Sequence, residues 1–184
     1  MRRLILSSAY IMIIVFTATA QNERTAPEKF CFSVAGTGAF TLDYISAFSL
    51  LTYGGDVQAE YSIEPKLAVT LSAGYLALSV RSIFGTDVTL PSFVPVLLGG
   101  RYYFRAKIYG SLQAGTSFII PAAASNFPLD AGKGNEFTYV PGIGYKFSKH
   151  IDLLFKYQSS TKYVPSAKQN INFSFAGLRI AYVF

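Results

Sequence analysis

The stretch "DVQAEYSIEPKLAVTLSAGYLAL", residues 56–78, decides the fold because apolar and polar residues alternate along it on both sides of a single turn. Alternation with a period of two is the pattern of a β-strand whose two faces meet different surroundings. The turn at 64–66 contains Pro65, which presets the backbone angle that a tight turn needs. The stretch therefore predicts an antiparallel hairpin with strands at 56–63 and 67–78.

The same unit recurs along the chain, with almost no helical periodicity beside it. Two further hairpins turn at 105–106 and 148–150, and one more strand lies at each end of the series. The expected strands outside the first hairpin are 93–104, 107–120, 136–147 and 151–158, with 30–42 at the start and the closing segment that ends at 184. The pattern predicts an all-β fold of eight strands.

The connections between these strands alternate in length. The tight turns are followed by much longer connections, at 43–54, 79–92, 121–135 and 159–169, which hold Gly, Pro, Ser, Thr and Asn. All the tight turns then lie at one end of a meander, as in outer-membrane barrels with short periplasmic turns and long extracellular loops. This favours an eight-stranded antiparallel up-and-down transmembrane β-barrel. A soluble lipocalin-like barrel is the alternative.

The chain begins with "MRRLILSSAYIMIIVFTATAQ", residues 1–21. Arg2 and Arg3 give a positive start, an apolar run follows, and Ala18-Thr19-Ala20 fits a cleavage site, which is the order of a secretory signal peptide. The apolar run falls short of the ~20 residues of a membrane-spanning helix. We expect a signal peptide at 1–20, a barrel domain at 21–184 and a location in the cell outer membrane.

Composition indicates which face of the strands meets lipid. The chain is 51% hydrophobic and only 14% charged, and its polar face is rich in small residues that suit a narrow lumen. The net charge of +6 is scattered rather than clustered, so no nucleic-acid partner is expected. Aromatic residues flank the tight turns on the apolar face, as at a membrane interface. These expected belt residues are Phe30, Tyr61, Tyr102, Phe104, Tyr145, Phe147, Tyr182 and Phe184.

Seven charged residues fall on the polar faces and are expected in the lumen. They are Glu60, Arg101, Lys107, Lys146, Asp152, Lys156 and Arg179. Buried charges are tolerated when they are paired and hydrogen-bonded, so Glu60 and Asp152 are expected to pair with some of the bases in the periplasmic half. An eight-stranded lumen is only wide enough for side chains to fill it. A structural salt-bridge network is therefore the first interpretation, and a gate or ion path is the second.

Residues suited to catalysis or metal binding are scarce. His150 is the sole histidine, in an expected turn, and Cys31 is the sole cysteine. One histidine with one distant cysteine cannot form a zinc site, and His150 is interpreted as a solvated turn residue rather than part of a catalytic arrangement. We expect no enzyme activity, no cofactor and no metal. A single cysteine also excludes an intramolecular disulfide.

The closing segment carries a family resemblance. Leu178, Ile180, Tyr182 and Phe184 alternate up to an aromatic end. Together with the eight strands and the alternating connections, this resembles the small eight-stranded outer-membrane β-barrel proteins of Gram-negative bacteria, the OmpA-, OmpX- and OmpW-like group. In that group, such an ending looks like the signal read by the barrel-assembly machinery. The resemblance implies this machinery as a partner and is compatible with a monomer.

One part of the closing segment departs from the pattern. Ile171, Phe173 and Phe175 fall in the opposite phase from Phe184. A bulge between Phe175 and Leu178, or a switch above the membrane, is expected to reconcile the two phases.

Several functions fit such a barrel. The expected one is a structural or surface-binding role, in membrane integrity or adhesion, through the extracellular loops, with outer-membrane lipids and lipopolysaccharide as partners. Lys162 and Lys168 lie in the expected loop at 159–170, where they either meet lipopolysaccharide phosphates or are simply solvated. The alternatives are a barrel that transports or binds small solutes or apolar ligands, and a lipid-modifying barrel enzyme, which the position of His150 disfavours.

We predict that deleting Phe184, or adding a polar tail after it, impairs insertion and leaves export intact, because the ending of the last strand is expected to be the assembly signal. Fractionation of outer membranes, with heat-modifiable gel mobility as the measure of folded barrel, checks this. A normal yield of folded barrel from both variants would contradict that role.

Overall fold

The computed structural model of the protein describes residues 29–42, 51–79, 91–120, 135–164 and 169–184. The expected signal peptide at 1–20 lies outside these residues, as do the central parts of the expected long connections. No helix in the described ranges is long and apolar enough to cross a membrane.

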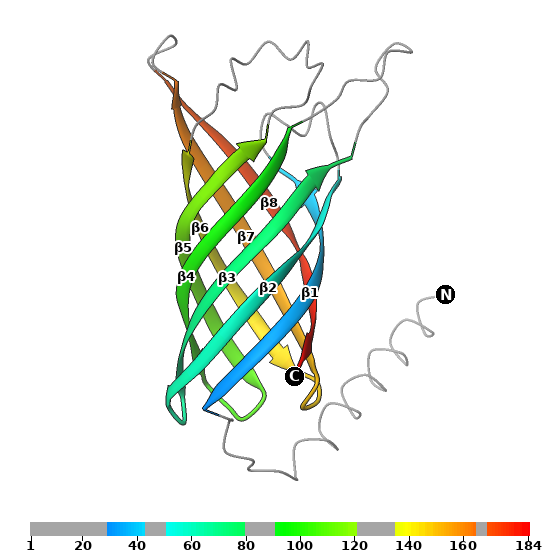
Figure 1. Ribbon diagram of the computed structural model, residues 1–184, viewed down its shortest axis with the longest axis vertical. Helices are drawn as coiled ribbons and strands as arrows, with labels where there is room; N and C mark the ends of the chain where they lie inside the picture. The colour runs from blue at the N-terminus through cyan, green and yellow to red at the C-terminus, as the bar shows by residue number, and fades with distance from the viewer. Residues whose placement is uncertain (1–28, 43–50, 80–90, 121–134, 165–168) are drawn as a thin grey trace, which may run out of the picture.

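The described residues form one closed antiparallel barrel (Figure 1). Each strand pairs with its neighbours in chain order, and the first strand pairs with the last. The strands are β1 (Phe30–Thr41), β2 (Leu51–Glu64), β3 (Leu67–Leu78), β4 (Ser92–Tyr103), β5 (Ile108–Ile120), β6 (Asn135–Lys146), β7 (Ile151–Val164) and β8 (Gln169–Val183). The predicted eight-stranded up-and-down barrel is confirmed, and the ring formed by the described residues is closed, so neither β1 nor β8 is an open edge strand.

Two strands are longer than the sequence pattern indicates. β2 begins at Leu51 rather than at 56, and β7 continues to Val164 rather than ending at 158. The expected loop at 159–169 is therefore wrong, since only residues 165–168 separate β7 from β8. Ser159, Ser160 and Thr161 pair with β6 and β8, but they are all polar, so no apolar alternation marks them as a strand.

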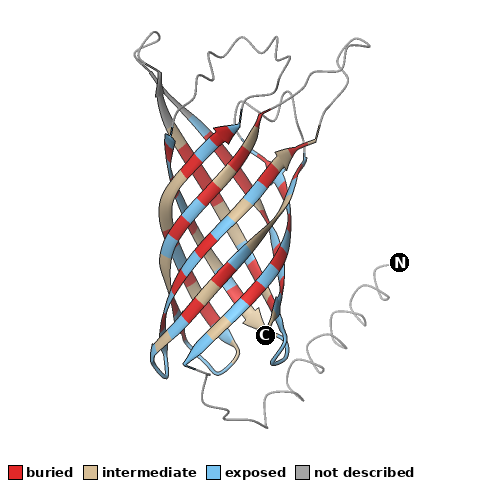
Figure 2. Cartoon of the chain, viewed as in Figure 1, coloured by how far each residue is buried: buried red, intermediate tan, exposed pale blue. Residues whose placement is uncertain are grey.

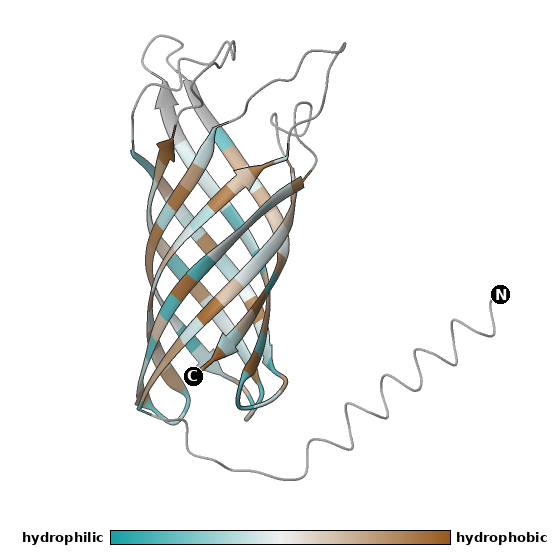
Figure 3. Cartoon of the chain, turned by 45° about the vertical axis from the view of Figure 1, so that its right-hand side comes forward, coloured by the Kyte–Doolittle hydropathy of each residue, from teal (hydrophilic) through white to brown (hydrophobic). Residues whose placement is uncertain are grey.

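Burial alternates along most of the strand residues for which it is described, as the bands in Figure 2 show, whereas residues 158–160 of β7 and 173–175 of β8 are buried in succession. Large apolar side chains face outward, among them Leu98, Leu112, Ile143 and Phe155. Polar ones such as Thr70, Ser117 and Thr138 are buried inside, and the hydropathy colours alternate in the same way in Figure 3. A soluble barrel would bury the apolar face, so the exposed apolar face excludes the lipocalin-like alternative and fits the outer-membrane type.

The expected belt residues gather near the tight-turn end, which is the end formed by the turns at 65–66, 104–107 and 147–150. All eight are exposed except Tyr145, which is half-buried. Neighbouring rings pack against one another: Tyr182 and Phe184 have ring centroids 5.1 Å apart, and Tyr102 and Phe104 have centroids 5.5 Å apart. Leu178 and Ile180 continue this outward stripe along β8.

The expected bulge in β8 is absent, and this alternative of the prediction is wrong. The register of β8 with β7 and with β1 runs without a shift through residues 175–178. Phe173 and Phe175 therefore share the inward face with Arg179, and all three are buried. The opposite phase has a simpler cause, because these two rings fill the lumen instead of facing lipid.

Closure of the barrel depends on a close approach of β8 to β1. A Cβ atom added at Gly177 would collide with the carbonyl oxygen of Gly38 and with the Cβ of Ala39. Gly36, in the same pair of strands, has nothing within 4 Å of its added Cβ and lies on the outward face.

We predict that Gly177→Leu destabilises the barrel by at least ~1–3 kcal/mol, the usual cost of overpacking, because backbone atoms cannot move aside as a side chain can. Gly36→Leu, which adds the same side chain toward lipid, is the matched control and should fold normally. The folded fraction after refolding in detergent, measured by heat-modifiable gel mobility, checks this. Equal folded fractions for both variants would count against a close-packed seam.

Candidate functional site

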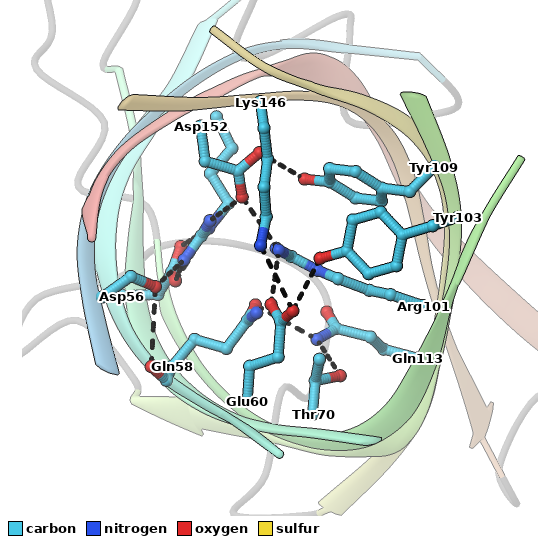
Figure 4. A network of polar contacts seen from close by, with 12 residues as sticks. Asp56, Gln58, Glu60, Thr70, Arg101, Tyr103, Tyr109, Gln113, Lys146 and Asp152 are labelled. Carbon is cyan, nitrogen blue, oxygen red and sulfur yellow. Dashed lines mark hydrogen bonds and ion pairs between the residues drawn. The ribbon is translucent and has the colours of Figure 1, made fainter. Parts of the chain in front are cut away.

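Arg101 occupies the centre of a charged layer inside the barrel (Figure 4). Its Nη1 atom lies 2.8 Å from Oε2 of Glu60 and 2.9 Å from Oδ2 of Asp152. The Arg101 side chain comes from β4, Glu60 from β2 and Asp152 from β7, and each side chain is less than a tenth exposed. One guanidinium therefore joins strands from three parts of the barrel wall.

Two inward tyrosines complete the coordination of these carboxylates. The hydroxyl of Tyr103 donates to Oε1 of Glu60 at 2.6 Å, and that of Tyr109 donates to Oδ1 of Asp152 at 2.7 Å. The Arg101 guanidinium also lies 4.4 Å from the ring centroid of Tyr109, within the range of a cation–π contact. Hydrogen-bonded and paired in this way, the buried charges avoid the cost of an unpaired ion.

A second pair lies beside the first. Arg179 of β8 donates to Asp56 of β2, with 2.7 Å from Nη2 to Oδ1 and 3.0 Å from Nε to Oδ2. Two donors of the guanidinium fork thus meet both carboxylate oxygens, which is the strong bidentate geometry. Asp56 was not among the residues expected in the lumen. Its position on the same face as Gln58 and Glu60, two and four residues later, was the signal that could have placed it there.

The structure brings together five of the seven charged residues expected in the lumen, and these five are Glu60, Arg101, Lys146, Asp152 and Arg179. In this group, Nζ of Lys146 lies 3.5 Å from Oε1 of Glu60. Lys156 faces the lumen and lines a cavity farther along the barrel. Lys107 lies apart, half-buried in the turn before β5, where its carbonyl accepts a hydrogen bond from the Lys146 amide at 2.8 Å.

An apolar plug fills the lumen at the end opposite the tight turns. It consists of Ala39, Leu76, Leu78, Phe93, Ile119, Phe173 and Phe175. The Phe93 ring lies 5.7 Å from the Phe173 ring and 5.8 Å from the Phe175 ring, between centroids, at tilted angles that aromatic pairs favour. Since period-two patterns assign apolar residues to the lipid face, the sequence did not indicate this plug.

His150 is exposed in the turn between β6 and β7. Its Nδ1 atom lies 3.0 Å from the carbonyl oxygen of Val183, and its ring stacks on Tyr182 with centroids 5.5 Å apart. It therefore packs against the end of β8 and is more than a solvated turn residue. In the described part of the chain, no group of three or more His, Cys, Asp or Glu side chains is placed to hold a metal ion.

A closed barrel with lipid-type side chains outside and a polar, side-chain-filled interior defines the class of transmembrane outer-membrane barrels. The chain matches the family called outer membrane protein beta-barrel domain over residues 9–184. It belongs to this family, which confirms the resemblance seen in the sequence, and the protein is an integral outer-membrane β-barrel. No curated protein sequence matches the chain.

Solved structures share the fold at low sequence identity. The outer membrane protein Ail of Yersinia pestis, in a phospholipid nanodisc, is 13% identical with a TM-score of 0.53, over 85% of this chain and 100% of Ail. Neisserial surface protein A is 12% identical with a TM-score of 0.51, over 85% and 96% of the two chains. The N-terminal barrel domain of Pseudomonas aeruginosa OprF is 14% identical with a TM-score of 0.50, over 84% and 97%.

We predict that Arg101→Met destabilises the folded barrel by about 3–5 kcal/mol, because it leaves Glu60 and Asp152 buried without their shared cation. Arg105→Met, in the exposed turn two residues beyond the end of β4, removes the same charge at no buried site and serves as the control. Urea unfolding in lipid vesicles gives both values. If Arg101→Met lowers the free energy of unfolding no more than Arg105→Met does, the charged layer has no stabilising role.

Proposed function

We propose that the protein is a non-conducting outer-membrane barrel with a structural or surface-binding role, in membrane integrity or adhesion, exerted through its extracellular connections. The observation that carries this proposal is the filling of the lumen. The charged layer closes it toward the tight turns and the apolar plug closes it toward the opposite end. A scaffold sealed in this way anchors exposed connections rigidly, and binding functions concentrate on such connections.

Transport through the lumen is the less favoured function. A solute would have to separate the ion pairs of Arg101 and then displace the rings of Phe93, Phe173 and Phe175. The first obstacle is ionic and the second is apolar. A solute that weakens the ion pairs is therefore poorly suited to pass between the rings. A lipid-modifying activity is also disfavoured, because His150 contacts Val183 and Tyr182 rather than an acidic partner.

Lipid is the partner that the outer face supports. Exposed apolar side chains surround the barrel, and a ring of exposed aromatic residues such as the belt is typical of the level of lipid headgroups. The proposed contact with lipopolysaccharide concerns Lys162 and Lys168. Lys168 and the Lys162 side chain lie outside the described residues. The barrel-assembly machinery remains a proposed partner for the outward stripe from Leu178 to Phe184, and the proposed state is a monomer.

Planar bilayers test the sealed lumen. We predict that the wild-type barrel gives no steady, large conductance, and that Phe93→Ala does not create one, since the charged layer still closes the lumen. A folded reference porin in the same bilayer controls for insertion. Steady large conductance from the wild-type barrel would overturn the proposed function in favour of transport.

A further inference from the structure

A small cavity lies in the middle of the lumen, between the charged layer and the apolar plug. Its volume is about 20 Å³, which is room for one water molecule or an ion of similar size. Polar side chains that line it come from strands around the ring: Asp56 and Gln58 from β2, Gln113 from β5, Lys156 and Gln158 from β7, and Arg179 from β8. The cavity therefore lies across the barrel axis rather than in one wall.

The lining presents donors that make no hydrogen bond among the described residues, and one of them, Nη1 of Arg179, lies 4.0 Å from Oδ2 of Asp152. They are Nε2 of Gln58, Nε2 of Gln158 and Nη1 of Arg179, and each of the three residues is only 2% exposed. The Oε1 atom of Gln58 accepts a hydrogen bond from Nε2 of Gln113 at 3.4 Å, which directs the Gln58 Nε2 donor toward the cavity. A buried donor left without an acceptor lowers the stability of the fold. A bound group that accepts hydrogen bonds from this lining would remove that cost.

The charges around the cavity also call for an anion. The Asp56 carboxylate lines the same cavity as Lys156 but is bound by Arg179, and Lys156 takes part in none of the ion pairs within 4.0 Å found among the described residues. Four cations, Arg101, Lys146, Lys156 and Arg179, thus face three carboxylates, Asp56, Glu60 and Asp152, in this part of the lumen.

A fourth buried carboxylate, that of Glu136, is too distant to balance Lys156. Glu136 pairs in register with Ser117, and Lys156 pairs with Gly142 of the same strand. At ~3.3 Å per residue, the two positions on β6 lie about 20 Å apart. The positive charge at Lys156 therefore has no nearby counter-charge from this carboxylate.

We propose that this cavity is a binding site for a small monovalent anion of the size of chloride, held by Lys156, Arg179, Gln58 and Gln158. An anion accepts hydrogen bonds from every side and supplies the missing negative charge. A water molecule has the right size but brings two donors of its own to a lining whose orphaned atoms are all donors, and it leaves the charge uncompensated. This proposal rests on the proposed function, in which the lumen is filled and does not conduct. It adds a bound anion as one of the groups that fill the lumen.

Stability in different salts tests the site. The wild-type barrel in zwitterionic lipid vesicles is unfolded with urea in sodium chloride and in sodium gluconate at equal ionic strength, since gluconate is too large for the cavity. Chloride at ten times its dissociation constant should raise the folded-to-unfolded ratio about tenfold. Lys156→Met, which keeps an unbranched side chain one atom shorter and without the charge, should abolish this difference, and Gln158→Leu should reduce it. Lys149→Met, on the exposed turn, is the control and should retain the full difference.

An equal folded-to-unfolded ratio in the two salts, or a full chloride effect in Lys156→Met, would overturn the site. If Lys156→Met fails to fold, crystals of the wild-type barrel grown in bromide decide the matter. Anomalous scattering at the cavity supports the site, and a cavity without it refutes the site. Planar-bilayer conductance separates the two proposals: steady conductance refutes the sealed lumen, whereas a non-conducting barrel without a chloride effect refutes only the anion site.

Discussion

The absence of water in the hydrocarbon of a membrane is the constraint on which the rest of this structure depends. Each backbone N–H and C=O group that crosses the hydrocarbon must find its partner in the protein, and strands achieve this only when the sheet closes on itself. Pairing of β1 with β8 provides that closure. Once the ring exists, period-two alternation divides every strand between lipid and lumen, and the small circumference of eight strands forces inward side chains into contact.

The lumen solves its packing problem in two different ways. Toward the tight turns, Arg101 gathers two carboxylates and their tyrosine donors into a network in which opposite charges satisfy one another. Toward the other end, rings from β4 and β8 fill the space by shape alone. A charged network depends on geometry. Removing one partner from it is costly, because an unpaired ion then remains buried. An apolar plug tolerates small rearrangements better.

Much of this arrangement could be predicted from the sequence, because a strand with lipid on one side and a polar lumen on the other alternates with a period of two. The hairpin at 56–78 and the lipid-facing side of β8 follow from that signal. The partners of Arg101 could not be derived, since they depend on how eight strands are staggered around the ring. Residues 159–161 could not be recognised as strand because they are all polar and show no alternation. Phe173 and Phe175 could not be placed because the rule that equates apolar with outward fails where rings fill the lumen.

The unbroken register of β8 has an evolutionary consequence. When one residue is inserted into or deleted from a strand without a bulge, the side chains beyond that point move from one face of the strand to the other. Such a change would turn Arg179 toward lipid and the Ile180 side chain into the charged layer. Lineages of this barrel should therefore diverge by substitution along their strands, whereas insertions and deletions of single residues should accumulate in the connections between them.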